Sequence, residues 1–161
     1  MVLDYRLLLP TEGDAASRIH RTAGAMIPGY DTSLHSETEF KAFYRDKVMV
    51  DGPVWGALHG SKLLGFVALL PGWIEHLYVD PQYHKRGIGG ELVRLAQREQ
   101  HELRLHTFQA NVRARRFYEQ HGFVIEELND GQRNEEKMPD VTYFWAHSQR
   151  SVMGVSDSDR Q

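Results

Sequence analysis

Hydrophobic residues along the chain change between the two-residue period of strands and the three-to-four-residue period of helices. Several short segments are rich in branched and aromatic residues and end at proline, glycine or polar clusters, which predicts strands. They are residues 2–9, 54–58, 63–70, 73–79, 103–108, 123–128 and 141–145. The segment 63–70 is apolar throughout, so we expect a central strand that is buried on both faces.

Helices are predicted between these strands, where apolar residues recur at helical spacing. The first begins near residues 11–14. Ser36 followed by Glu39 is typical of a capping box at the start of a second helix. A third follows the glycines of residues 87–90, and Asn111 can cap a fourth.

The remaining segments are predicted to be turns and loops. Residues 24–34 and 129–140 are rich in glycine, proline or polar residues and have no clear period. Residues 59–62 join two strands in a hairpin pattern. Residues 148–161 have few large apolar side chains, so we expect a disordered tail there. Residues 1–147 are therefore predicted to form one domain with a substantial core.

The segment 73–100 organises the chain, because a strand leads through a glycine-rich turn into a helix. Pro81 ends the strand, since proline cannot donate a hydrogen bond to a sheet. The turn consists of His84, Lys85, Arg86, Gly87, Ile88, Gly89 and Gly90. Glycines let a ligand approach the backbone, and N–H groups at a helix N-terminus attract an anion. The sequence therefore predicts a phosphate site at this turn.

Two common phosphate-binding turns do not match these residues. A P-loop requires Lys and then Ser or Thr after its last glycine, but Glu91 and Leu92 stand there. The Rossmann fingerprint requires a small residue three positions after Gly89, where Leu92 stands. The turn instead resembles the Q/R-x-x-G-x-G/A signature with which the GNAT superfamily of N-acetyltransferases binds the pyrophosphate of acetyl-CoA. One position departs from the signature, because His84 replaces the usual Gln or Arg.

A second segment is similar to another GNAT element, N-x-x-A-x-x-F-Y-x-x-x-G-F. It runs from Asn111 through Ala114, Phe117 and Tyr118 to Phe123. The distance between the two blocks suits one helix and one strand. The resemblance covers about residues 3–145 and implies an α/β (α+β) domain with the GNAT fold. Its central sheet would be mixed, mostly antiparallel and splayed at the fourth strand, with helices on both faces.

The resemblance also implies which residues hold acetyl-CoA. Backbone groups of Leu77 and Val79 would carry the pantetheine arm and the thioester oxygen. Asn111 would hydrogen-bond to the same arm, unless its only role is that of a helix cap. The expected coenzyme-binding set is Leu77, Tyr78, Val79, His84, Lys85, Arg86, Gly87, Ile88, Gly89, Gly90, Asn111 and Phe117.

Two residues are candidates for acid–base catalysis in the resemblance. A Glu or His at the position of Glu75 is often the base, and strict alternation would place Glu75 on the side of Leu77, with His76 on the opposite face. Tyr118 matches the tyrosine that protonates the CoA thiolate in many GNAT enzymes. The alternatives are a surface carboxylate paired with a cation for Glu75, and core packing for Tyr118.

The acceptor side is less well defined by the sequence. In GNAT proteins the early loop and helix wall this site, which makes Tyr30, His35 and Tyr44 candidate substrate contacts, together with Trp73. Packing or solvent exposure is the alternative for each. The nine histidines form neither H-x-H nor H-E-x-x-H, so no metal site is expected.

The composition argues against several other classes of protein. A formal charge of −3 argues against a general nucleic-acid binder, and the absence of cysteine excludes disulfides and thiolate nucleophiles. No apolar run approaches the ~20 residues of a membrane span, and no signal peptide is evident. We therefore expect a cytoplasmic protein without nucleic-acid or membrane partners, and a homodimer stays open.

These observations predict an N-acetyltransferase that uses acetyl-CoA as cosubstrate. The acetyl group would pass to the primary amine of a small molecule by direct attack in a ternary complex. One alternative is an enzyme that acetylates protein N-termini or lysines. Another is a GNAT-fold module that binds acyl-CoA without catalysis. The loop of residues 24–34 and Trp73 favour a confined site for a small amine.

Overall fold

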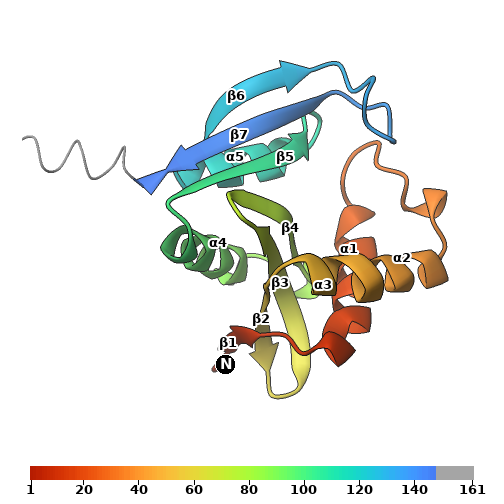
Figure 1. Cartoon of the computed structure of the whole chain (residues 1–161), viewed down its shortest axis with the longest axis vertical. Helices are drawn as coiled ribbons and strands as arrows, with labels where there is room; N and C mark the ends of the chain where they lie inside the picture. The colour runs from red at the N-terminus through yellow and green to blue at the C-terminus, as the bar shows by residue number, and fades with distance from the viewer. Residues whose placement is uncertain (148–161) are drawn as a thin grey trace, which may run out of the picture.

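The computed structural model describes residues 1–147, so the predicted tail of residues 148–161 lies outside the described residues. In this part the strands form one sheet in the order β1-β2-β3-β4-β5-β7-β6 (Figure 1). The pair β4–β5 is parallel and all other neighbours are antiparallel. The expected mixed, mostly antiparallel sheet is confirmed.

The elements follow the predicted order along the chain. The strands are β1 (Asp4–Leu7), β2 (Val54–His59), β3 (Lys62–Leu70), β4 (Trp73–Val79), β5 (Glu102–Phe108), β6 (Val124–Asn129) and β7 (Asp140–Ala146). The helices are α1 (Gly13–Gly24), α2 (Glu37–Phe43), α3 (Met49–Asp51), α4 (Ile88–Glu99) and α5 (Val112–Gln120). A π-helical turn, Tyr44–Val48, joins α2 to α3. No helix within residues 1–147 is long and apolar enough to cross a bilayer.

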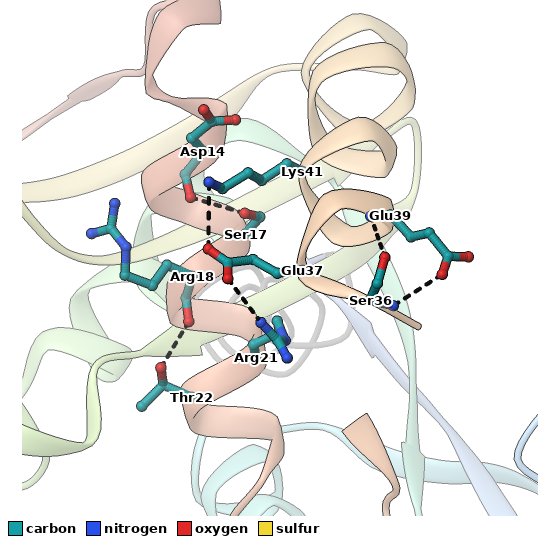
Figure 2. Close-up of polar contacts among 9 residues, drawn as sticks. All are labelled: Asp14, Ser17, Arg18, Arg21, Thr22, Ser36, Glu37, Glu39 and Lys41. Atoms are coloured by element: carbon teal, nitrogen blue, oxygen red, sulfur yellow. Dashed lines mark hydrogen bonds and ion pairs between the residues drawn. The ribbon is translucent and has the colours of Figure 1, made fainter. Parts of the chain in front are cut away.

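Polar contacts fix the start of α2 against α1 (Figure 2). The Ser36 hydroxyl accepts from the Glu39 N–H at 3.1 Å, and the Glu39 carboxylate accepts from the Ser36 N–H at 3.0 Å, so the predicted capping box is confirmed. The Glu37 carboxylate lies 3.4 Å from Lys41 in its own helix and 3.7 Å from Arg21 in α1. These ion pairs are exposed and therefore contribute little stability.

The strand β3 lies at the centre of the core and is buried on both faces, as predicted. Leu64 and Val67 pack in the cluster that contains α4, and Phe66 packs in the cluster that contains α1. All three side chains have no solvent-exposed surface. The helices α4 and α1 contact β3 from opposite faces (Figure 1), so the sheet separates two apolar layers.

The sheet splays between β4 and β5. Their register contains the single pair Trp73 and Arg104, beside which the Arg104 N–H donates to the Gly72 carbonyl at 2.8 Å. Beyond this point the two strands diverge (Figure 1). The expected splay at the fourth strand is therefore present, and it leaves peptide groups of β4 without a neighbouring strand.

A β-bulge interrupts β4 at the residue predicted to be the catalytic base. His76 pairs with Ala68 and Ile74 pairs with Leu69, so Glu75 has no partner in β3. Ile74, not Glu75, therefore packs in the same apolar cluster as Leu77. The expectation of strict alternation along this strand is wrong, because the inserted residue reverses the order of the two faces.

Truncations on the two faces of β3 test the position of this strand. Leu64→Ala and Phe66→Ala should each lower the free energy of unfolding by about 3 kcal/mol, since each leaves a cavity in a different apolar layer. Val124→Ala is the control, because Val124 is 53% exposed and should cost less than ~1 kcal/mol. Urea titration followed by circular dichroism measures all three. A cost as small as that of the control at either site would show that this face of β3 is not core.

Candidate active site

The gap between β4 and β5 contains a narrow cavity of about 110 Å³. Its walls include Leu77 and Tyr78 of β4 and Asn111 and Tyr118 at α5. Alternate residues of an antiparallel strand hydrogen-bond to the neighbouring strand, and the Asp80 N–H donates to Leu64 of β3 at 2.8 Å. The peptide groups of Leu77 and Val79 therefore face away from β3, toward the gap. A ligand that lies there can form strand-like hydrogen bonds with β4.

The backbone of the glycine-rich turn is suited to an anion. Lys85 and Gly87 have positive φ angles of 64° and 80°, a backbone arrangement that turns successive N–H groups toward one concave site. No side chain caps α4, so the N–H groups of its first turn are free to bind a ligand. The imidazole Nε2 of His84 donates to the Val79 carbonyl at 2.9 Å. The residue that departs from the signature thus anchors the turn to the end of β4.

This turn and the gap fit coenzyme A as a ligand. The first N–H groups of a helix with no capping side chain suit a pyrophosphate. A side chain at Gly89 would begin 3.3 Å from the ring of Phe117, so glycine lets α5 pack closely against the turn. The predicted residues of the turn and of α5 are therefore brought together at one end of the gap.

Tyr118 lies on α5 where the helix faces the gap. Its side chain is 8% exposed, packs beside Phe123 and Tyr143, and lines the gap cavity. Burial raises the pKa of its phenol, and no residue in the described part of the chain hydrogen-bonds to its hydroxyl. The tyrosine is thus both a packing residue and a protonated donor at the cavity. Asn111 caps α5, accepting from the Ala114 N–H at 3.2 Å.

A larger pocket of about 740 Å³ opens beside the gap. The two cavities share Glu75, His76, Tyr78, His106, Thr107 and Phe108. Carboxylates line the larger pocket at Glu39, Glu75, Glu135, Glu136 and Asp140. None of the residues found in its wall is Lys or Arg. The pocket is therefore acidic and meets the gap at the bulge of β4.

The four predicted acceptor residues have different positions. Tyr30 and His35 line the large pocket. Tyr44 is fully buried in the core and does not belong to the pocket wall, so its predicted direct substrate contact is corrected. Trp73 lies at the closed end of the gap beside Arg104, with its ring 4.9 Å from that of His106, and is also outside the pocket wall.

Sequence reasoning missed a buried histidine beneath the pocket. His20 of α1 lies with Nδ1 2.5 Å from the Tyr44 hydroxyl, and its ring stacks on Tyr78 at 4.2 Å between centroids. Burial and then the nearby His76 lower the pKa of His20 to about 3. Its imidazole is therefore neutral at physiological pH. Tyr44 contributes to the pocket through this contact, since His20 lines the wall and Tyr44 does not.

His76 lies in the same cluster, 5.4 Å from His20 between ring centroids. It is half-buried, lines the large pocket with Glu75, and has no hydrogen-bond partner within residues 1–147. Burial lowers its pKa to about 4, so this imidazole is neutral and can accept a proton or a hydrogen bond. The bulge explains why His76 and Glu75 line one pocket although strict alternation predicts opposite faces.

Comparison with known proteins identifies the family of the chain. Residues 50–125 match the family model described as an acetyltransferase (GNAT) domain. The uncharacterized N-acetyltransferase YafP of Escherichia coli K12 is 33% identical over 70 residues, which span 44% of this chain and 45% of YafP. The peptidyl-lysine N-acetyltransferase YiaC of the same organism is 30% identical over 102 residues, which span 63% of this chain and 68% of YiaC.

The chain belongs to the GNAT superfamily of N-acetyltransferases. Solved structures share the fold of this GNAT domain. Apo YjaB from Escherichia coli matches with a TM-score of 0.72 at 22% identity, over 90% of this chain and 98% of that one. The PaiA N-acetyltransferase from Thermoplasma acidophilum, in complex with coenzyme A, matches with a TM-score of 0.67 at 21% identity, over 91% and 99%.

The neutral state of His20 makes the stability of this GNAT domain depend on pH. Its pKa lies below the ordinary value of 6.5, so the stabilisation is present above pH 6.5 and is lost as pH falls toward 3. The stability advantage of the wild type over His20→Phe should therefore shrink by about 2 kcal/mol between pH 7.5 and pH 5. Urea titrations at both pH values measure this difference.

His59→Gln is the control for loss of an imidazole at an exposed position, at the end of β2. If the stability advantage of the wild type over His20→Phe is equal at both pH values, folding does not hold His20 neutral.

Proposed function

We propose that the protein transfers the acetyl group of acetyl-CoA to the primary amine of a small molecule, without a covalent intermediate on the protein. The observation that carries this proposal is the meeting of two cavities at the bulge of β4. The narrow cavity leads to the turn and to Tyr118, and the wide one is acidic and aromatic. Each reactant therefore has its own entrance to Glu75 and His76.

Residues of the gap would hold the coenzyme on its side of the bulge. The N–H groups of the turn at residues 85–90 would bind the pyrophosphate, and the peptide groups of Leu77 and Val79 would bind the pantetheine arm. Lys85 and Arg86 add positive charge beside the turn. Acetyl-CoA supplies an acetyl group that is activated as a thioester.

Residues of the large pocket would prepare the acceptor. An alkyl amine with a pKa near 10.4 is neutral in only about one molecule in two thousand at pH 7, so it must lose a proton before it reacts. Glu75, at the junction of the two cavities, is the proposed base. His76 is the second candidate, because its imidazole is neutral and free of hydrogen bonds within residues 1–147.

Tyr118 is the proposed acid for the leaving thiolate. Its hydroxyl group lies at the gap and stays protonated because burial raises its pKa. Donation of this proton leaves a phenolate, which regains a proton from the base side or from water. The ammonium form of the acceptor loses two protons in all: one is balanced by protonation of the thiolate, and the other leaves through the base to water, so no external acid is consumed.

A second candidate function is acetylation of lysine side chains in peptides, which the similarity to the peptidyl-lysine N-acetyltransferase YiaC favours. The walls of the pocket favour a small acceptor. His35, between α1 and α2, lies 2.7 Å from Glu135, between β6 and β7, so the two loops lie side by side (Figure 1), and both residues line the pocket. The third possibility is a GNAT-fold module that binds acyl-CoA without catalysis. Acyl transfer to any amine would exclude it.

Kinetics of two variants test the proposal, after a screen of CoA release with polyamines, amino acids, aminoglycosides and lysine peptides. Tyr118→Phe keeps the ring and removes the acid, so kcat should fall at least ~100-fold while affinity for acetyl-CoA hardly changes. Glu75→Gln should act on the amine side, so its deficit should shrink as pH rises from about 6 to 10 and deprotonates the substrate. The screen and both pH profiles use release of free CoA as readout.

Wild-type kcat in Tyr118→Phe, with release of CoA shown not to limit the rate, would assign Tyr118 to packing alone. A Glu75→Gln deficit that is constant with pH would assign the base to another group, and His76→Gln would then be compared. Absence of CoA release with every amine would remove the proposed function and favour the binding module.

A further inference from the structure

The five carboxylates of the large pocket differ in whether the protein itself neutralises them. Glu39 accepts from the Ser36 N–H, and Glu135 lies 2.7 Å from the His35 imidazole. Asp140 accepts from the side chains of Asn129 and Asn134. Glu75 and Glu136 have no hydrogen bond or ion pair within residues 1–147. Glu75 also lines a smaller cavity with Lys47, which pairs with Asp51 at 2.7 Å, so the pocket presents two carboxylates that no close ion pair neutralises in this part of the chain.

Glu136 extends from the loop between β6 and β7 and is half-buried in the pocket wall. Tyrosine side chains lie near it. Burial raises the pKa of Tyr30, and the charge of Glu136 raises this pKa further. The same carboxylate contributes to the raised pKa of Tyr78, after burial and the nearby Tyr30 and Tyr118. Glu136 thus faces the interior of the pocket, on a different element from Glu75.

The loop that carries Glu136 is held in place. The Asn134 side chain donates to the Met138 carbonyl at 2.7 Å and accepts from the Met138 N–H at 3.2 Å. The next residue, Glu135, lies 2.7 Å from His35, and both residues line the pocket. The position of Glu136 is therefore fixed before a ligand binds, which lowers the entropy cost of binding.

A pocket that combines these two carboxylates with an aromatic wall suits an alkyl chain with a cation at each end. Aromatic rings line the wall at Tyr30, Phe40, Phe43, Tyr78 and Phe108. Such rings bury methylene groups and attract ammonium ions over their faces. Because no Lys or Arg lies in the described wall, a cationic ligand meets no like charge from these residues. Glu136 is half-buried and has no hydrogen bond or ion pair within residues 1–147, which favours a ligand that supplies the missing cation.

We propose that the acceptor is a linear alkyl diamine or polyamine, with one amine beside Glu75 and His76 and a second ammonium group bound by Glu136. This inference rests on the proposed function and specifies its substrate. A monoamine fills the aromatic part of the pocket but leaves Glu136 without a partner, so the second charge distinguishes good substrates from poor ones.

Matched amine pairs test the inference. The rates of CoA release are compared for 1,4-diaminobutane against butylamine and for 1,5-diaminopentane against pentylamine. The wild type should prefer the diamine at least tenfold in kcat/KM in one or both pairs. Glu136→Gln should lower this diamine-to-monoamine ratio at least fivefold. Glu127→Gln removes the same charge from an exposed position on β6 outside the pocket, and its ratio should stay within twofold of the wild type.

Calorimetry of the same amines, with the protein saturated with CoA, gives a readout that does not require catalysis. Tighter binding of the diamine that is lost in Glu136→Gln supports the inference even if no amine is acetylated, in which case only the proposed function fails. Equal kcat/KM for diamine and monoamine in an active enzyme overturns the inference and leaves the proposed function standing. Preference for a lysine peptide over every diamine by tenfold also overturns it.

Discussion

The single backbone contact between β4 and β5 is the constraint on which the site depends. The strands meet at Trp73 and Arg104, and α4 must pass between them in sequence, on one face of the sheet. Beyond the contact, the outward peptide groups of β4 have no strand partner, and buried peptide groups need hydrogen bonds from some source. The gap and the uncapped start of α4 lie at the same side of β4, because the turn at residues 80–87 connects them directly. One continuous surface can therefore bind the pantetheine arm and the phosphates of the coenzyme.

The bulge at Glu75 joins the proposed coenzyme groove to the large pocket. An inserted residue brings Glu75 and His76 to the wall of one pocket, where an uninterrupted strand would send them to opposite faces. This arrangement places polar imidazole groups inside an aromatic layer, where a charged group would be unfavourable. His20 and His76 stay neutral there, because burial lowers the pKa of each. His20 also shares a hydrogen bond with Tyr44. The proposed acceptor pocket thus combines neutral imidazoles with carboxylates in its wall.

The parts of the fold set by local sequence were predictable, and those set by tertiary contacts were not. The capping box at Ser36 and Glu39 depends on four consecutive residues, and the apolar run of β3 depends on composition alone, so both were found. The bulge was missed because its only cause is the pairing of β4 with β3. Tyr44 was a candidate substrate contact because the early loop and helix wall the acceptor site in GNAT proteins, yet a π-helical turn and the contact with His20 place it in the core. His20 and Glu136 could not be assigned, since each acquires its surroundings from elements distant in sequence.

The central claim is that one groove, from the gap of β4 and β5 to the start of α4, binds acetyl-CoA. The most direct test is a titration of ¹⁵N-labelled protein with CoA, followed by backbone amide chemical shifts. The account predicts that the largest changes fall on the amides of Leu77 and Val79 and on those of residues 85–90. Amides of β1 and β6, which lie at the two outer edges of the sheet, should hardly move. Shifts that leave the turn and β4 unchanged while another surface responds would contradict the account.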